Sequence, residues 1–477
     1  MRDRKLNDQE EVRRRKLERL KESNCSPYIV ERVLVTHSLE EILSLDESYQ
    51  EEIGCAGRIL FIRQTFLVIS ESASRLQLYI DLKDSNKEAV HTYFKEFIDI
   101  GDYIFCKGHL FKTKTGALTL SLNHIEIISK CLKPLPEKHT GITDPELLVR
   151  NRTGSLIVNS ELFNDLRERS LILFELRSYL NKLGYMEVET PILHKIAGGA
   201  TARPFKTYHN TLKEDLYLRV APELYLKRLI VSGFTKVFEI GRSFRNEGID
   251  STHNPEFSSI EIYTAYQDMD DTISLTERLI SNLLTKFLKE DESNAYLKKP
   301  FRRAPIWELL RKKTGLDFWA NPPTLEEAIV MAEAKGIELE QGDTNLSRIY
   351  EKFFEELIEP ELIEPTFVYG FSSLLSPLAK KDLKNDFFSR RFELYIGGKE
   401  IANGFSEQND PLEQERQFEA QLQEDPDSKE VDYDYLSSLE YGLPPTGGVG
   451  IGLDRLVMLL LNRKSIKDVL AFPYLKG

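Results

Sequence analysis

A polar loop between two expected strands is the feature that most limits how this chain can fold. Residues 236–244 (KVFEIGRSF) are typical of a β-strand, and residues 257–263 form a second run of the same kind. The period of two places four side chains on one face of the second strand: Phe257, Ser259, Glu261 and Tyr263. The pair predicts a sheet on which an aromatic ring, a carboxylate and a phenol face one space.

The loop between these strands carries side chains suited to a nucleotide. Arg245 has a planar guanidinium that matches a phosphate, and Phe257 has a face on which a base can stack. Glu247 and His253 sit on or beside the loop. Any one of these residues alone is better explained by a hairpin with a solvated salt bridge and core aromatics. The whole string favours a ligand site, because polar loops rarely assemble this combination beside strand-borne aromatics.

A second hairpin is expected at residues 391–407 (RFELYIGGKEIANGFSE), with Gly397-Gly398 as its two-residue turn. This register brings Glu393 and Glu400 to one face of the ribbon, diagonally adjacent. Two like charges so close need a cation or a shared proton. If ATP is the ligand, magnesium is the hard, oxygen-seeking ion that fits.

The residues of this hairpin leave an alternative equally open. Arg391 or Lys399 could neutralise the two carboxylates instead of a metal ion. Three further side chains share one face of the second strand: Asn403, Phe405 and Glu407. Strict alternation puts Glu400 on the opposite face, unless Gly404 or Ala402 marks a β-bulge.

A glycine-rich segment lies close to the C-terminus. In residues 443–460, a strand or loop feeds directly into an apolar helix that carries Arg455. Its glycines let the backbone approach a flat ligand closely. No Gly-Lys-Ser/Thr follows, so the segment is not a Walker phosphate loop, and it does not match the dinucleotide fingerprint either.

The N-terminal third has a different character. Residues 8–24 predict a charged amphipathic helix capped by Asn7 or Asp8. Residues 53–131 contain about five short β-rich runs and one helix at 91–97, the signature of a small oligonucleotide-binding barrel. We therefore expect a helical segment over 1–50, the barrel over 51–135 and a proline-containing linker over 136–157.

The remainder, residues 158–477, predicts one large domain. A long helix begins near residue 160 and ends near Gly184, and strands and helices alternate from there. Between about 272 and 375 the pattern is mostly helical and charged, which indicates an insertion between two strand-bearing halves. The expected fold class is α+β.

Charge and composition exclude several classes of protein. The net charge of −13 argues against a generic polyanion binder, although local patches can still contact RNA. None of the four cysteines forms a Cys-x-x-Cys pair, so neither a zinc knuckle nor a redox pair is indicated. No apolar run approaches a membrane span of about 20 residues. The charged N-terminus differs from a secretory leader, so we expect a cytoplasmic protein.

Three segments together resemble the ordered motifs of class II aminoacyl-tRNA synthetases. They are GYMEVETPIL (184–193), FRNEG…HNPEF…E (244–261) and GLPPTGGVGIGLDR (442–455). Within that class the chain resembles the lysyl-tRNA synthetases, from about residue 10 to the end. The strings that carry this closer likeness include GGATARPF (198–205), SPLAK (376–380) and EIANGFSE (400–407).

The resemblance implies an antiparallel sheet flanked by helices, preceded by an oligonucleotide-binding barrel that reads the anticodon. It also implies a homodimer, with Pro191 and the preceding helix at the interface. The implied substrates are L-lysine, ATP and tRNA-Lys, with Mg²⁺ as the metal. No membrane is involved.

The resemblance also assigns roles at the nucleotide. Arg245 lies on the α-phosphate of ATP, and Arg455 sandwiches the adenine with Phe257, so the two arginines are the expected catalytic residues. Glu247 and His253 border the nucleotide. The remaining pair, Glu393 and Glu400, holds magnesium. The resemblance therefore favours a metal ion over neutralisation of the two carboxylates by a basic side chain.

The implied lysine pocket is defined by carboxylates. An ammonium that enters a partly desolvated pocket needs paired negative charge, which Glu261 and Glu407 supply with Tyr263 as hydrogen-bond partner. Glu223 and the backbone of Gly199 suit the α-amino end. The wall is completed by Asn403 and Phe405. An aspartate-specific relative would need a basic residue there.

The expected reaction is attack of the lysine carboxylate on the α-phosphate, followed by transfer to a ribose hydroxyl at the tRNA 3′ end. Two alternatives remain. One is a paralogue that lysylates a protein such as a translation factor, but those relatives lack the barrel. The other is a catalytically dead RNA-binding regulator, which predicts loss of catalytic residues that are present here.

Two segments depart from the family pattern. Residues 148–156 (LVRNRTGSL) keep two arginines but lack the usual tyrosines. In the barrel, the family's Arg-x-Met-Gly-Lys stretch is absent near residues 58–66. Phe66 and Gln77 keep the spacing of the anticodon-stacking aromatic and its partner, and Arg63 is the candidate to replace a lost arginine.

Overall fold

The computed structural model describes residues 6–475 apart from 82, 85–86, 137–144, 197, 200–201, 290, 341, 344 and 425–430. The chain forms two compact units, Met1–Asn164 and Asp165–Gly477, and each is described by itself. Part of the expected linker 136–157, residues 137–144, lies outside the described residues.

The first unit is built on a closed five-stranded barrel, which confirms the expected oligonucleotide-binding type of fold. Its strands follow the order β1-β2-β3-β5-β4 around the barrel: β1 (Ile53–Arg63), β2 (Phe66–Glu71), β3 (Ser74–Tyr79), β4 (Tyr103–Lys112) and β5 (Leu118–Ser129). Alternate apolar side chains such as Leu67, Ile69 and Leu78 fill the barrel and are fully buried. Helix α3 (Glu88–Phe97) lies between β3 and β4 in sequence and includes the predicted helix at 91–97.

The helices of this unit have clear sequence determinants. Helix α1 (Asp8–Glu22) begins after Asn7, whose side chain accepts a hydrogen bond from the backbone of Glu10 in a capping box, so Asn7 is the cap. Short helices follow: η1 (Pro27–Ile29), α2 (Leu39–Ser44), α4 (Pro145–Arg150) and α5 (Arg152–Val158). The altered segment at 148–156 is thus helical.

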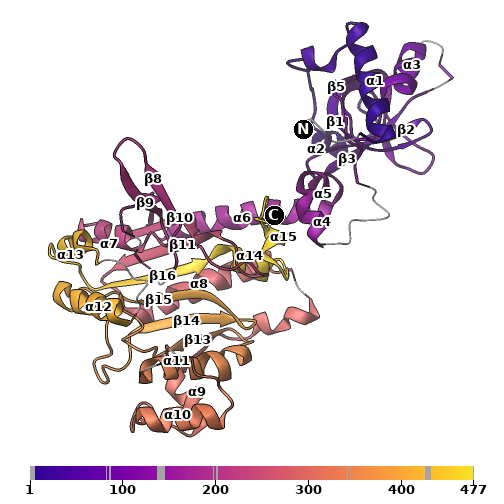
Figure 1. The fold of residues 1–477 in the computed structure, drawn as a ribbon. Coiled ribbons are helices and arrows are strands. Elements are labelled where there is room, and N and C mark those ends of the chain that lie inside the picture. The colour runs from indigo at the N-terminus through magenta and orange to yellow at the C-terminus, as the bar shows by residue number, and fades with distance from the viewer. Residues whose placement is uncertain are drawn as a thin grey trace. The chain divides into compact units, whose positions relative to one another are not determined.

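The second unit contains an eight-stranded sheet in the order β12-β13-β14-β15-β16-β11-β10-β6 (Figure 1). The strands are β6 (Met186–Glu187), β10 (Lys236–Phe244), β11 (Glu256–Ala265), β12 (Arg302–Pro305), β13 (Thr366–Tyr369), β14 (Arg391–Ile396), β15 (Lys399–Ser406) and β16 (Thr446–Gly452). All neighbours pair antiparallel except the two outermost pairs, which are parallel. The predicted antiparallel sheet is therefore confirmed. A small second sheet consists of β7 (Leu193–His194), β9 (Glu214–Leu218) and β8 (Lys206–His209).

Helices pack on the sheet through a continuous apolar core. Helix α8 (Met269–Phe287) starts at a capping box on Asp268 and buries Ile273, Leu279 and Ile280 against the sheet. The other helices of the unit are α6 (Ser160–Lys182), α7 (Glu223–Val231), α9 (Ile306–Thr314), α10 (Leu325–Ala334), α11 (Leu346–Leu357), α12 (Pro411–Glu424), α13 (Tyr433–Leu439), α14 (Leu453–Leu460) and α15 (Ile466–Val469), with short 3-10 turns η3 (Glu292–Lys298) and η4 (Glu359–Glu361).

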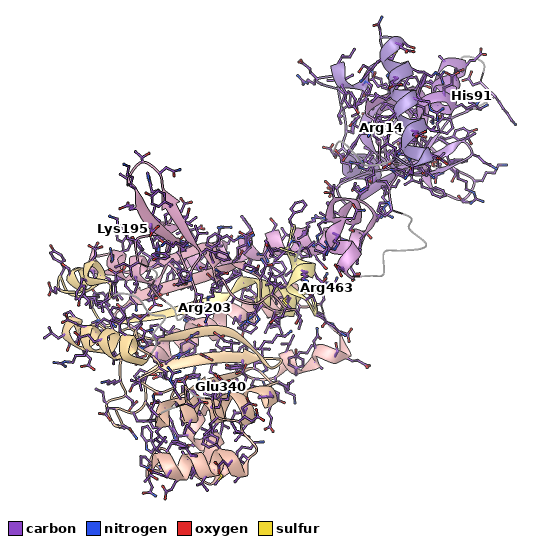
Figure 2. All side chains as sticks on the ribbon, in the orientation of Figure 1. Arg14, His91, Lys195, Arg203, Glu340 and Arg463 are labelled. Carbon is purple, nitrogen blue, oxygen red and sulfur yellow. The ribbon has the colours of Figure 1, made fainter. Side chains whose placement is uncertain are left out.

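The stretch expected as a helical insertion, about 272–375, contains α9, α10 and α11 around a separate aromatic core that includes Phe318, Tyr350 and Phe353. It also contains β12 and β13, which extend the main sheet beyond β14. Figure 2 places Glu340 among these helices and Arg203 over the main sheet. Among the described residues, no helix combines the length and apolarity needed to cross a bilayer.

Candidate functional site

The registers of four central strands assemble the site as two rows of side chains across one face of the sheet. In the first row Gly450 of β16 pairs with Glu261 on one side and Asn403 on the other, and Asn403 pairs with Glu393. In the second row Gly448 pairs with Tyr263 and Phe405, and Phe405 pairs with Arg391. Residues far apart in sequence therefore meet because directly opposed side chains on paired strands are neighbours.

The glycines of β16 form the floor between these side chains, for two different reasons. A Cβ at Gly448 would overlap the Glu407 carboxylate and come within 2.6 Å of the Tyr263 ring, and one at Gly447 would overlap Thr272. At Gly450 and Gly452 the nearest atoms would be 3.7 and 3.9 Å away. The expectation that the glycines admit a flat ligand therefore applies to the second pair, whereas the first pair is required by protein packing.

The hairpin of β14 and β15 has the predicted turn at Gly397-Gly398, where both glycines have positive φ. Its register shifts between Leu394 and Tyr395, whose partners are Ala402 and Glu400, so Ile401 is the extra residue. The bulge was expected at Ala402 or Gly404, and it lies one residue before the first of these. Because of it, Glu400 faces the same side as Asn403 and Glu393.

The two candidate metal ligands both have basic partners. Glu393 is buried, its Oε1 lies 2.5 Å from an Arg391 nitrogen, and its Oε2 accepts a hydrogen bond of 2.8 Å from the Tyr395 hydroxyl. Burial raises the pKa of Glu393 to about 8 despite Arg391. Glu400 lies 3.6 Å from Arg455. Among the described residues no group of three acidic, histidine or cysteine side chains has metal-binding geometry.

A divalent ion is still compatible with this donor set. Two carboxylates that share one face of a cavity can supply part of an oxygen shell, which Mg²⁺ commonly completes with water and phosphate oxygens. The salt bridge to Arg391 is the arrangement that the sequence left open as the alternative to a metal ion.

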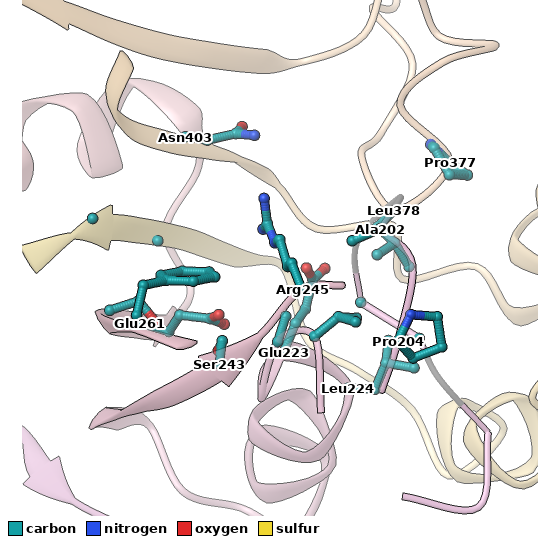
Figure 3. A pocket seen from close by; sticks show the side chains of 18 of the residues that line it. Ala202, Pro204, Glu223, Leu224, Ser243, Arg245, Glu261, Pro377, Leu378 and Asn403 are labelled. Atoms are coloured by element: carbon teal, nitrogen blue, oxygen red, sulfur yellow. The ribbon is translucent and has the colours of Figure 1, made fainter. Parts of the chain in front are cut away.

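Arg245 follows directly after β10, and its guanidinium carbon lies 5.1 Å from the centre of the Phe257 ring, the residue opposite the end of that strand. The buried Nε has no hydrogen-bond partner among the described residues. In Figure 3 the side chain rises from the sheet toward Asn403, with Glu223 and Glu261 nearby. The arginine is therefore poised on an aromatic face with unused hydrogen-bonding capacity.

Arg455 forms the opposite end of the nucleotide-suited part of the cavity. Its NH1 donates to the backbone oxygen of Glu400 at 2.9 Å, and its NH2 donates to Nε2 of His253 at 2.9 Å. Because arginine is always a donor, the His253 proton sits on Nδ1 and is donated to Asp250 at 2.7 Å. A chain of hydrogen bonds thus connects the loop after β10 to helix α14.

The start of α14 is anchored beside β11. Asp454 accepts a 2.9 Å hydrogen bond from the backbone of Ser258 and lies 2.6 Å from Arg169 of α6. This ion pair, in which Asp454 is buried, fixes the helix end that carries Arg455. At the end of the glycine-rich motif, Asp454 therefore anchors the helix, whereas Arg455 faces the cavity.

A cluster of buried carboxylates lies at the other end of the cavity. Glu261 is 8% exposed, and its Oε2 accepts a 3.0 Å hydrogen bond from the Tyr263 hydroxyl. Burial, with the negative charge of Glu223, raises the pKa of Glu261 to about 8. Glu407 follows β15 and is fully buried, and burial raises its pKa as well.

One residue of this cluster was missed by the sequence reasoning. Lys227 is fully buried on α7, where its Nζ lies 2.5 Å from Glu223 Oε1 and forms an ion pair with Glu407. The spacing of Glu223 and Lys227, four residues apart on a helix, was a signal that could have identified it.

A single cavity of about 1530 Å³ connects the nucleotide-suited part of the site with the carboxylate cluster (Figure 3). It contains every candidate for lysine, ATP and metal binding: Gly199, Glu223, Arg245, Glu247, His253, Phe257, Glu261, Tyr263, Glu393, Glu400, Asn403, Phe405, Glu407 and Arg455. Glu247 lies exposed in the loop after β10, and Gly199 has a positive φ of 94° close to Glu223. One end of the cavity suits a phosphate-bearing ligand and the other a cation.

The barrel residues singled out for an anticodon lie on the outer side of β2 and β3 and at the end of β1. Phe66 pairs with Tyr79, and Gln77 pairs with the next outward residue of β2. The Phe66 and Tyr79 rings are 5.0 Å apart, and the Phe111 ring lies 5.8 Å beyond Tyr79. Arg63 is exposed and pairs with Phe66. The sequence reasoning missed Tyr79 and Phe111, although outward positions in a strand repeat every two residues.

Comparison with known proteins gives a consistent result. The family model described as "tRNA synthetases class II (D, K and N)" matches residues 144–476. The lysine–tRNA ligases of Malacoplasma penetrans and Mycoplasma genitalium are each 45% identical to this chain, over 99% of both sequences. The lysine–tRNA ligase of Streptococcus pneumoniae is 44% identical over 99% of this chain and 98% of its own.

Proposed function

This chain belongs to the class II tRNA synthetases of the D, K and N group, and we propose that it is a lysine–tRNA ligase. It activates L-lysine with ATP and transfers the lysyl group to the 3′ end of tRNA-Lys. The observation that carries this proposal is the cavity whose one end holds Arg245 and Arg455 and whose other end holds three buried carboxylates.

The carboxylates decide between the amino acids of this group. A desolvated ammonium requires negative charge beside it, whereas an aspartate side chain requires a cation. Glu261 and Glu407 face the ε-ammonium, Tyr263 donates to Glu261, and Glu223 with the Gly199 backbone suits the α-amino end. Lys227, the basic side chain that contacts this cluster directly, is already paired with two of its carboxylates. Asn403 and Phe405 complete the wall.

In the first step an oxygen of the lysine carboxylate attacks the α-phosphorus of ATP in line, and the bond to pyrophosphate breaks. Arg245 binds the α-phosphate, where it stabilises the charge of the transition state. Arg455 and Phe257 hold the adenine, and Glu247 and His253 border the nucleotide. The reaction needs no nucleophilic side chain, because positioning and electrostatic stabilisation lower the barrier. Glu393 and Glu400 would hold Mg²⁺, which would neutralise phosphate charge.

In the second step a ribose hydroxyl of the tRNA attacks the acyl carbonyl of the adenylate and AMP leaves.

We assign anticodon binding to the barrel, residues 51–135, through stacking on Phe66 with Gln77 and Arg63 beside it. Residues 1–50 form its helical companion, residues 136–157 the linker, and residues 158–477 the catalytic domain. The barrel argues against a paralogue that lysylates proteins. We place the enzyme in the cytoplasm.

The enzyme is proposed to act as a homodimer. Several apolar side chains of the first class II motif and its helix are exposed in the single chain: Leu171, Phe174, Met186, Ile192 and Leu193. Phe174 is 68% exposed on α6. Exposed large apolar side chains within one segment of the chain favour a protein interface there.

The test is lysine-dependent exchange of pyrophosphate into ATP, followed by charging of a tRNA-Lys transcript. We expect exchange with lysine and none above background with aspartate or asparagine. Exchange without charging would support lysine activation but contradict the proposed tRNA step. Absence of lysine-dependent exchange would refute the proposal.

A further inference from the structure

Lys227 lies inside the carboxylate cluster of the cavity and has no exposed surface. Its Nζ lies 2.5 Å from Glu223 Oε1 and forms an ion pair with Glu407 Oε2. The ammonium also lies 5.3 Å from the centre of the Phe405 ring, within the range of a cation–π contact. The chain's own ammonium thus bridges the carboxylates assigned to the two ends of the substrate.

Without the Lys227 ammonium, the negative charges of the carboxylate cluster are not balanced. Glu223, Glu261 and Glu407 are three buried carboxylates, and like charges in a desolvated site cannot all remain ionised without cations nearby. Burial alone would lower the pKa of Lys227, but Glu223 and Glu407 outweigh burial and raise it. Lys227 therefore stays charged, and its ammonium opposes the rise that burial causes in the pKa of Glu223 and of Glu407.

The ion pair also leaves one oxygen of Glu407 available. Lys227 engages Oε2, while Oε1 has no hydrogen-bond partner among the described residues. Gly448 permits this placement, because any side chain there would overlap Oε1. Beside Glu407, the Oε2 atom of Glu261 accepts a hydrogen bond from the Tyr263 hydroxyl.

We propose that Lys227 is a positioning residue for the substrate, which holds Glu407 by one oxygen so that the other faces the substrate ammonium. This inference rests on the proposed activation of lysine. The fixed ammonium neutralises one carboxylate, and the entering substrate supplies the remaining positive charge. Lys227 is fully buried and does not line the cavity, so it acts through Glu407 and Glu223.

The titratable and charged groups that act on Lys227 or on its partners come from several elements. They are Glu223 and Arg228 of α7, Glu261 and Tyr263 of β11, Arg391 of β14, Glu407 after β15 and Tyr435 of α13. Loss of the lysine leaves the carboxylates among them without their shared cation, so protonation of Glu407 is favoured at neutral pH.

The test is K227M in lysine-dependent pyrophosphate exchange at pH 7. We expect the KM for lysine to rise at least tenfold at pH 7, while the KM for ATP changes less than twofold.

A matched control exists in the barrel. Lys130 is also fully buried and bridges two carboxylates, Asp99 at 2.6 Å and Asp102 at 2.7 Å. K130M removes the same kind of ion pair, so it should lower thermal stability but leave the KM for lysine unchanged. If K227M does not fold, K227Q keeps a hydrogen-bond donor and carries the same expectation.

Two outcomes would overturn the role of Lys227: an unchanged KM for lysine, or an equal rise in the KM values for lysine and ATP. The failure of the proposed function looks different, because wild-type protein would then show no lysine-dependent exchange at all.

Discussion

Replacing Glu261 with glutamine separates the role of this carboxylate in binding from its cost to the fold. Glu261 is 8% exposed, and its pKa of about 8 lies far above the ordinary 4.5 because of burial and the charge of Glu223. Ionising it in the empty pocket is therefore unfavourable, with an upper limit of roughly 5 kcal/mol at about 1.36 kcal/mol per pH unit. E261Q has nearly the same shape and no charge to lose.

The expected effects of E261Q on lysine binding and on thermal stability have opposite signs. Removing one carboxylate from a buried charge pair costs about 2–3 kcal/mol of binding at the lower end of the usual range, so the KM for lysine should rise roughly 30- to 150-fold. At pH 7 wild type must first release the Glu261 proton, at a cost of about 1.4 kcal/mol. The ratio of E261Q to wild-type KM should therefore grow up to about tenfold between pH 7 and pH 9.

Thermal stability should respond in the other direction. A carboxyl whose pKa is raised in the folded state binds more protons there than in the unfolded state, so stability is lost as pH rises from 4.5 through 8. E261Q should consequently melt roughly 2–5 °C above wild type at pH 8.5, with no difference at pH 4.5. E256Q is the control, since Glu256 is exposed on the same strand.

The measurements are steady-state pyrophosphate exchange with lysine or ATP varied, and melting curves at both pH values. Equal rises in the two KM values would refute the pocket assignment. A lower melting temperature for E261Q at pH 8.5 would refute the electrostatic reasoning.

Three further predictions test other parts of the molecule. R245A should abolish lysine-dependent exchange, whereas R242A, an exposed arginine of the preceding strand β10, should not; near-normal exchange in R245A would contradict the phosphate assignment. Glu351 has an unpartnered buried Oε1 and a pKa raised by burial to about 7, so E351Q should raise the melting temperature at pH 8 but not at pH 4.5, and an equal change at both values would contradict this. F174E places a charge at the proposed dimer face and should yield a monomer in analytical ultracentrifugation, with an intact dimer counting against that interface.

Much of the fold was accessible from local patterns. The strands at 236–244 and 256–265, the barrel and the Gly397-Gly398 turn follow from alternation and turn chemistry that operate over a few residues. The motif strings were also sufficient to identify the family, because the chain matches its model over residues 144–476.

Other features depend on contacts between distant segments. The bulge at Ile401 is decided by pairing with β14, not by the residues of β15 alone. The requirement for Gly447 and Gly448 arises from Thr272 and Glu407, which approach from a helix and from the end of another strand.

The sequence by itself determined which side chains were available for the site and which strands carried them. Only the tertiary structure decided how their charges are shared. Lys227 and Glu407 are 180 positions apart in the chain, yet they form a buried ion pair, since α7 packs beside the strand end that carries Glu407. The strength of such a pair depends on desolvation and on separation in space, and neither quantity is a property of a local segment.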